Sequence, residues 1–427
     1  MNHEGGTWNM VQSHDGVTLK INAKGAIEFT DDEADVRSIS RGGYLTIARS
    51  TGGWLSSDEQ RFEAREVNGA IERSYFVNGK PLGADQGRAW LKTFLPDLLR
   101  EMAVNADHRV ARLLKTGGPS AVLDDVTRTR SGYAKSVYLR ELYKQATLDQ
   151  PMLTRSLQQA GREVGSDYDL AEALGVAADR QPIDGSLPAF VESARAIKSD
   201  YDERRVLARV FARKSVSPDV AAAVFKAATP GPGNTGIDSD YELAELLLQA
   251  PPALVRQPAS GWTEAVNTVG SAYDRRRAIS AVLRPGADPS TVEGALAAAI
   301  GISSDYDLAT LLEEGVKAGV LTDRTGSAYL AAAGHIKSSY DRRRVLDAIA
   351  RSSVGDQSLA GAAALAGQIP SDYDRAESLI ALSHASGIGP SARRALADNA
   401  TSMKSDYDRG RVLSALAKAG ILTTDGR

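Results

Sequence analysis

A short motif, Ser-Asp-Tyr-Asp or a close variant, occurs nine times between residues 131 and 408, and its tyrosines are spaced by 32 to 40 residues. A fixed period of this size means that one supersecondary unit packs on copies of itself. The motif therefore constrains the architecture of about two thirds of the chain. The nine tyrosines are Tyr133, Tyr168, Tyr201, Tyr241, Tyr273, Tyr306, Tyr340, Tyr373 and Tyr407.

Each motif predicts the start of a helix. With Ser199 as the N-cap, Asp200, Tyr201 and Asp202 take the first three helical positions, which is a capping box with Asp in place of Glu or Gln. The helix dipole also favours acidic residues there. Six residues after each tyrosine from Tyr168 onward the chain is aliphatic, which predicts a buried stripe. These residues are Leu174, Leu207, Leu247, Ile279, Leu312, Leu346, Leu379 and Leu413.

A second helical segment, rich in alanine, lies between successive motifs, as in residues 220–225, 295–300 and 362–365. Small side chains allow helix axes to approach to about 8 Å. The sequence thus predicts a mainly α fold, in which residues 131–427 form a right-handed α-solenoid of nine two-helix repeats, similar to HEAT and armadillo arrays. An insertion at 229–236 accounts for the single 40-residue spacing and is expected to be an exposed loop.

The N-terminal part has a different pattern. Residues 1–83 are predicted to form a small antiparallel β domain of four to six strands, because 17–22, 26–29, 44–47 and 73–77 resemble strands. Asn68-Gly69 and Asn78-Gly79 are typical hairpin turns. Residues 84–130 are predicted to be connecting helices, with a kink or division at Pro96 and a break at 117–119.

Charge alternates along the repeats. Four residues after the motif tyrosine, acidic and basic side chains follow one another, so the true period is two repeats. The residues are Glu172, Arg205, Glu245, Arg277, Thr310, Arg344, Glu377 and Arg411. Equivalent positions of adjacent repeats lie side by side, and five of the seven junctions would therefore place Glu against Arg. This charge ladder is predicted to fix the repeat register, at about 0 to 1 kcal/mol per exposed pair.

Two features have a functional alternative to a structural role. The additional arginines Arg204, Arg275, Arg276, Arg342 and Arg343 could form a positive ridge for an anionic ligand or nucleic acid. Each arginine triplet follows an acid, however, and the net charge is −3, which argues against nucleic acid. The tyrosines could line a groove as a row of phenols, but we expect each ring to pack between neighbouring repeats.

The sequence holds little that indicates catalysis. It has no cysteine, its five histidines lack metal-ligand spacing, and no phosphate-binding loop or nucleophile elbow is present, which predicts neither an enzyme nor a cofactor or metal site. The acidic cluster 31–33 with Asp35 is expected to be a solvated turn, with weak cation binding as the alternative. An enzymatic alternative would place activity around Trp54, Trp90 and Asp97.

The segments IKSSYDRRRVL (336–346) and GAIEFTDD (25–32) resemble the non-catalytic extensions of some bacterial BlaR1-type membrane metallopeptidases and related envelope-signalling proteins. This chain lacks the membrane helices and the zinc motif of the peptidase, so no peptidase activity carries over. The resemblance implies a sensor or interaction module of bacterial origin that works at the envelope.

The sequence therefore predicts a non-enzymatic scaffold or sensor that binds a protein or peptide, and the alternative is a HEAT-like binder of nucleic acid or another anion. No signal peptide or membrane span is apparent, so a cytoplasmic location is expected, or a periplasmic one if a leader has been removed. After Tyr407 the helix should end near Ala419 without a second helix. This half-built repeat predicts self-association or a covering partner.

Overall fold

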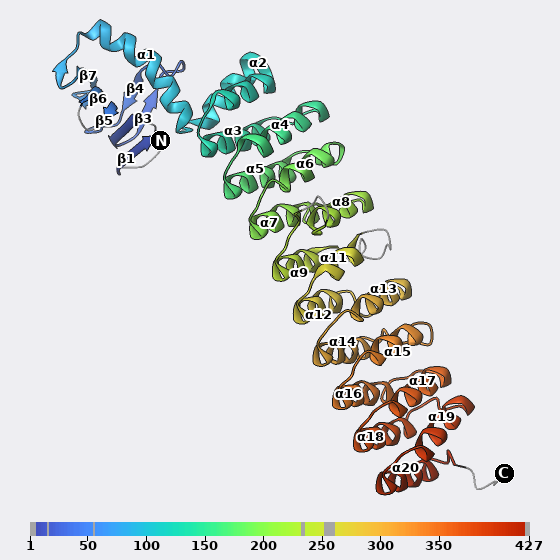
Figure 1. Cartoon of the computed structure of the whole chain (residues 1–427). Coiled ribbons are helices and arrows are strands. Elements are labelled where there is room, and N and C mark those ends of the chain that lie inside the picture. Colours follow the sequence, from blue (N-terminus) through green and yellow to red (C-terminus); the bar gives the residue numbers. More distant parts are fainter. Residues whose placement is uncertain (1–5, 15–16, 54–55, 232–234, 252–260, 423–427) are drawn as a thin grey trace. The chain divides into compact units, whose positions relative to one another are not determined.

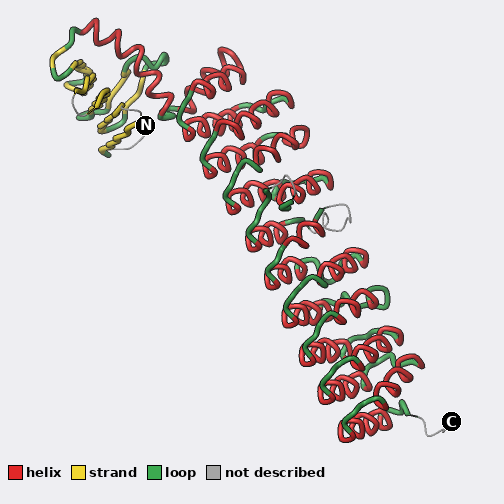
Figure 2. Tube along the Cα trace, viewed as in Figure 1, coloured by secondary structure: helices red, strands yellow, loops and turns green. Residues whose placement is uncertain are grey.

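The computed structural model describes residues 6–14, 17–53, 56–231, 235–251 and 261–422. Contacts divide the chain into a first unit of residues 1–152 and 163–169 and a second unit of residues 153–162 and 170–427. Strands come first along the chain, and helices follow (Figure 2). The first unit holds the sheet, the connecting helices and the first motif, so these contacts do not separate the parts predicted at residues 83 and 131.

The first unit begins with antiparallel strands. Six of them form one sheet in the order β1-β2-β5-β6-β7-β8, and β3 and β4 form a separate pair. Their bounds are β1 Thr7–His14, β2 Val17–Lys24, β3 Ile27–Phe29, β4 Val36–Ile39, β5 Tyr44–Gly53, β6 Ser56–Val67, β7 Ala70–Val77 and β8 Lys80–Pro81. Both predicted Asn-Gly hairpins are present, and all four turn residues have positive φ, as a type I′ turn requires.

One face of the sheet is covered by α1 (Ala84–Glu101). Leu91 and Leu95 of this helix are buried together with Phe62 and Tyr75 of the sheet. A Cβ at Gly87 would lie 2.1 Å from the Tyr75 ring, so only glycine allows this close packing. The helix continues through Pro96, and the predicted division there is therefore wrong.

The helices that follow agree with the predicted break. The segment α2 (Ala106–Arg128) is interrupted at Gly118, where φ is 67° and ψ is −168°, directly before Pro119. Next comes α3 (Gly132–Gln145), whose N-cap is Ser131 of the first motif, and then α4 (Gln150–Glu163).

Each later motif begins a helix, and within the described residues a second helix follows each of these motif helices except α20. The motif helices are α5 Asp167–Arg180, α7 Asp200–Phe211, α9 Asp240–Gln249, α12 Ala272–Ser280, α14 Asp305–Lys317, α16 Ser339–Ala350, α18 Asp372–Ser383 and α20 Asp406–Lys418. The second helices are α6 Leu187–Ala194, α8 Pro218–Ala228, α11 Trp262–Thr268, α13 Pro289–Ala299, α15 Gly326–Gly334, α17 Asp356–Gly367 and α19 Pro390–Thr401. A 3₁₀ turn, η1 Ile183–Ser186, precedes α6.

Within the second unit like helices pack on like helices. From α7 to α20 each motif helix contacts the next motif helix, and from α6 to α19 each second helix contacts the next second helix. Figure 1 shows these helices as two parallel rows. The fold is therefore mainly helical, with a small antiparallel sheet before it.

The helix N-caps and the buried aliphatic stripe that the sequence predicts are present in the structure. In all seven motifs of the second unit from Ser199 onward, the serine hydroxyl accepts a hydrogen bond from the third helical N–H. These N-caps are Ser199, Ser239, Ser271, Ser304, Ser338, Ser371 and Ser405. The predicted aliphatic stripe is buried from Leu174 to Leu379, and only Leu413 on α20 is half-buried. The predicted loop 229–236 connects α8 and α9, and its residues 232–234 lie outside the described residues.

Candidate binding surface along the motif helices

The motif tyrosines lie on the surface. In the second unit they are Tyr201, Tyr241, Tyr273, Tyr306, Tyr340, Tyr373 and Tyr407, and we call them the tyrosine row. Their exposed fractions range from 53% to 76%. Tyr133 and Tyr168, in the first unit, are equally exposed. The expectation that each ring packs between neighbouring repeats is therefore wrong. The tyrosine is the second residue of its helix, and its side chain points away from the face that packs on the array.

Arginines four residues after a tyrosine bind the preceding repeat. Arg205 contacts Glu172 at 2.7 Å, and Arg277 contacts Glu245 at 2.5 Å. An ion pair also joins Arg411 to Glu377. These are three of the five junctions at which the sequence places Glu against Arg.

Where Thr310 interrupts the charge pattern, a different acid takes its place. Arg344 contacts Glu313, which lies one helical turn beyond Thr310, at 2.8 Å. Each of these four arginines also contacts the acid directly after its own tyrosine, as Arg205 contacts Asp202 at 2.8 Å. Every basic repeat of the second unit is thus bound to the acidic repeat before it.

The arginine three residues after the tyrosine reaches in the opposite direction. Arg204 contacts Glu242 at 2.5 Å, Arg276 contacts Asp307 at 3.0 Å, and Arg343 contacts Asp374 at 3.2 Å. In each case the acid belongs to the following repeat. The junctions between Arg205 and Glu245 and between Arg344 and Glu377 are therefore bridged by different side chains from those that the sequence alone suggested.

The remaining two residues of the predicted arginine ridge are bound to backbone oxygens. Arg275 donates to the carbonyls of Asn267 and Gly301, and Arg342, which is buried, donates to the carbonyls of Gly334 and Ile336. Carboxylates neutralise Arg204, Arg276 and Arg343, and carbonyls hold Arg275 and Arg342. The five arginines consequently act within and between repeats, and they do not form a common positive surface.

The same guanidinium groups lie against the tyrosine rings. The Arg277 guanidinium carbon is 5.8 Å from the ring centroid of Tyr241 and 5.7 Å from that of Tyr273. Arg343 lies in the same way between Tyr340 and Tyr373, at 5.3 and 5.7 Å. Cation–π attraction at these distances contributes about 0.5 to 1 kcal/mol at exposed sites.

Other arginines complete this pattern. Arg411 lies between Tyr373 and Tyr407, at 6.0 and 5.9 Å, and Arg344 lies 5.2 Å from the Tyr306 ring. Each ring in these contacts is supported by a guanidinium that carboxylates hold in turn. The result is a surface on which phenol and guanidinium groups alternate.

Sequence reasoning missed the role of the first helical aspartate. Asp240 accepts hydrogen bonds from the N–H groups of Gly270 and Ser271, at 2.8 and 2.7 Å, in the next motif. Asp305 bonds Lys337 and Ser338 in the same way. The regular spacing of an acid one residue after the capping serine is the signal that could have indicated it. Asp200 and Asp372 bond the capping serine of the next motif in the same way, so the aspartate joins successive helix starts at four junctions.

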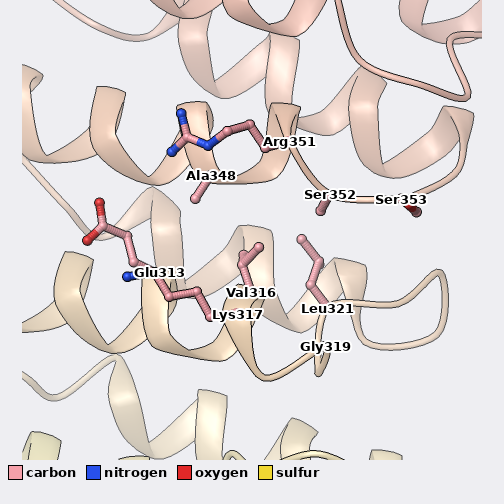
Figure 3. Close-up of a pocket in the computed structure, with 9 residues that line it drawn as sticks. All are labelled: Glu313, Val316, Lys317, Gly319, Leu321, Ala348, Arg351, Ser352 and Ser353. Carbon is pink, nitrogen blue, oxygen red and sulfur yellow. The ribbon is translucent and has the colours of Figure 1, made fainter.

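Grooves open at the other end of the motif helices. The cavity between α14 and α16 has a volume of about 630 Å³, and Figure 3 shows Glu313, Lys317 and Arg351 around it. A second cavity of about 430 Å³ lies between α5 and α7 at the same place in the repeat, where Arg209 is the counterpart of Ala348. These two grooves are lined largely by polar and charged side chains.

In the first unit, the acidic cluster 31–35 forms an ion-pair network. Glu33 is buried and contacts the buried Arg109, which also contacts Asp125 at 2.7 Å. Arg112 contacts the other Glu33 oxygen at 3.1 Å. The expectation of a solvated turn is therefore wrong for Glu33. This network joins the loop between β3 and β4 to α2.

Asp35 belongs to the same loop. It contacts Arg73 of β7 at 3.0 Å. The described residues hold no group of three or more His, Cys, Asp or Glu that could bind a metal ion.

Glu203 is an exception among the repeats. It occupies the position that Arg275 and Arg342 take in other basic repeats, only 1% of its surface is exposed, and its Oε1 has no hydrogen-bond partner among the described residues. The pKa of Glu203 is raised to about 8, mainly by burial and also by the neighbouring Asp200 and Asp238, and Arg195 partly opposes this increase.

Two of the three residues of the enzymatic alternative, Trp90 and Asp97, belong to the described part of the chain. Trp90 stacks on Phe94 with ring centroids 5.2 Å apart, and Asp97 contacts Arg100 at 2.9 Å. Trp54 lies outside the described residues. Among the helices that the structure describes, none has both the length and the apolar character needed to cross a membrane.

Comparison of the chain with protein-family models, with curated proteins and with solved structures found no significant match.

Proposed function

We propose that this protein is a non-enzymatic scaffold that binds a protein or peptide along the tyrosine row. The observation that supports this most directly is the exposure of seven tyrosines at one position of successive repeats. Tyrosine and arginine are, with tryptophan, the residues enriched among those that supply most of the binding energy at protein interfaces. Here they alternate along one surface, supported by ion pairs.

The proposed scaffold is a right-handed α-solenoid of two-helix repeats, similar to HEAT and armadillo arrays. The contacts between successive motif helices and between successive second helices support this arrangement. Solenoids use extended surfaces made of equivalent positions in many repeats. A sensor role at the bacterial envelope, which the resemblance to BlaR1-type extensions implies, is part of the proposal, and so is a cytoplasmic or periplasmic location.

A peptide-display experiment tests this function. A random peptide library is selected on the full protein, and the enriched peptides are then measured against the variant Tyr273→Ser/Tyr306→Ser/Tyr340→Ser. Because these side chains are exposed, the substitutions should leave the fold intact, which circular dichroism can verify. We expect peptides that bind the wild type and lose about tenfold or more in affinity with the variant. Equal binding to both proteins would contradict the proposal.

Self-association through the last repeat is a separate prediction. Leu413 is half-buried although its counterparts in the other motif helices are buried, and Tyr407 is the most exposed member of the tyrosine row. Light scattering over a range of concentrations should show a mass that increases above the monomer, and the variant Leu413→Gln should reduce the increase. A constant monomer mass would contradict it.

A further inference from the structure

The tyrosine row has a chemistry that selects among peptide ligands. Its rings carry phenol hydroxyls for which the described part of the chain offers no hydrogen-bond partner, and more than half of each side chain is exposed. Such a ring presents an apolar face together with a donor at its tip. A ligand that matches it combines apolar rings or faces with free backbone carbonyl groups.

The rings are also held in place before a ligand arrives. The Arg277 guanidinium lies between Tyr241 and Tyr273 and is itself fixed by Glu245 at 2.5 Å and Asp274 at 3.1 Å. Side chains that are ordered in advance lose less conformational entropy on binding. A rigid, extended ligand gains most from such a surface, because it too has little entropy to lose.

The charges beneath the tyrosine row indicate which ligand charge is favoured. In the ion pairs beneath the tyrosine row every arginine that binds backward contacts two carboxylates, as Arg344 contacts Glu313 and Asp341. The carboxylates therefore outnumber the guanidinium groups. A ligand with basic side chains is favoured over an anionic one such as a nucleic acid.

The spacing of the row selects the ligand's conformation. Packed helices lie about 8 to 10 Å apart, so successive tyrosines recur at about that distance. A polyproline II helix advances about 9.3 Å in each turn of three residues, presents the same face every third residue and leaves its carbonyls unbonded. A β-strand alternates its faces every residue and cannot present one face every third residue. An α-helix satisfies its own carbonyls and places equivalent residues about 10.5 Å apart.

We propose that the tyrosine row binds a proline-rich segment in the polyproline II conformation, with one triplet per repeat and basic side chains between the prolines. This proposal rests on the proposed peptide-binding function and specifies its ligand class. Proline rings would stack on the tyrosine rings, the phenol hydroxyls would donate to the ligand's carbonyls, and Lys or Arg would face the surplus carboxylates.

The test uses fluorescent peptides and the full chain. The probe has about five Pro-Pro-Lys triplets, which is long enough to span about five repeats. Two matched peptides carry Ala-Ala-Lys or Pro-Pro-Glu triplets instead. We expect the Pro-Pro-Lys peptide to bind at least about tenfold more tightly than either control by fluorescence anisotropy, and to lose about tenfold in affinity with Tyr273→Ser/Tyr306→Ser/Tyr340→Ser.

A matched variant distinguishes the contribution of the tyrosine ring to binding from that of the hydroxyl group. Tyr273→Phe/Tyr306→Phe/Tyr340→Phe keeps the stacking surface and should retain more affinity than the serine variant. Equal binding of all three peptides, or binding of Pro-Pro-Lys that the serine variant leaves unchanged, would overturn the proposal. If displayed peptides bind the tyrosine row but the Pro-Pro-Lys peptide does not, the ligand class is wrong and the peptide-binding function stands.

Discussion

Reversing one pair of the charge ladder tests whether ion pairs stabilise the junctions between repeats. Arg205 lies 2.7 Å from Glu172 of the preceding repeat and 2.8 Å from Asp202 of its own helix, and the two side chains that bridge the junction are 25% and 23% exposed. The substitution Arg205→Glu removes both contacts and brings a third carboxylate into the site. Adding Glu172→Arg restores a pair of opposite charge across the junction.

The expected magnitudes follow from this partial burial. A partly exposed ion pair contributes up to about 1 kcal/mol, so two lost pairs and the new repulsion should lower the free energy of unfolding by about 2 to 3 kcal/mol in Arg205→Glu. The double variant recovers the pair between repeats but retains a repulsion with Asp202. It should therefore be about 1 kcal/mol more stable than Arg205→Glu alone.

Urea unfolding of the wild type, both single variants and the double variant gives the coupling energy. Because repeat arrays can unfold in segments, hydrogen exchange in α5 and α7 provides a local measurement beside it. Arg209 and Asp179 form the matched control, since they pair between the same two helices but are each 43% exposed. Reversing this control pair should give a coupling energy below about 0.5 kcal/mol.

The salt dependence adds a second criterion. The coupling of Arg205 with Glu172 should decrease at about 1 M salt, where the screening length is about 3 Å. Additive effects of the two substitutions, with no recovery in the double variant, would refute the charge ladder as a source of stability.

Three further predictions concern other contacts. Asp240→Ala should destabilise the array by about 1.5 to 3 kcal/mol, because two N–H groups of the next motif lose a charged acceptor; urea unfolding measures this. Arg109→Ala should lower the free energy of unfolding by about 3 to 5 kcal/mol, because it leaves Glu33 and Asp125 buried without their cation. Arg112→Ala should lower it much less, and thermal melts of both variants measure the difference. The folded-state pKa of Glu203 is raised to about 8, mainly by burial, so the folded state binds more protons than the unfolded state between about pH 4.5 and 8. Stability should therefore fall as pH rises through this window, by up to about 1.4 kcal/mol per pH unit. Glu203→Gln should reduce this pH dependence in thermal melts.

The helical repeat was predictable because its determinants are local. A capping serine, acids in the first turn and an aliphatic residue six positions after the tyrosine are each visible within one motif, and the structure confirms the caps. The strand β6 was not predicted because its charged outer residues conceal the alternation, in which Phe62 and Ala64 are the only buried residues among those of β6 whose burial is described. The pairing of Glu33 with Arg109 joins residues far apart in sequence, so no local pattern could indicate it.

The exposure of the tyrosines was not predicted, although the helical period of the motif helices indicates it. At about 100° per residue, the buried residues of α14 other than Ala309 lie on the side of the helix opposite to Tyr306. The buried residues of α14 are Leu308, Ala309, Leu311, Leu312 and Gly315. The expectation that the tyrosines pack between repeats relied on the usual burial of aromatic residues and did not apply this angle. A wheel drawn for one motif helix would have placed the ring on the surface.

The alternation of acidic and basic repeats explains how one repeated sequence can define a single register. In a basic repeat, one arginine binds backward and the preceding one binds forward, as Arg277 contacts Glu245 and Arg276 contacts Asp307. A slip by one repeat would place arginines against arginines, and like charges in contact are destabilising. Opposite charges stay together only if one part of the array shifts by two repeats against the next part. Such a shift displaces twice as many helix caps and buried side chains as a shift by one repeat. The same arginines support the tyrosine rings, so the contacts that set the register also order the proposed binding surface.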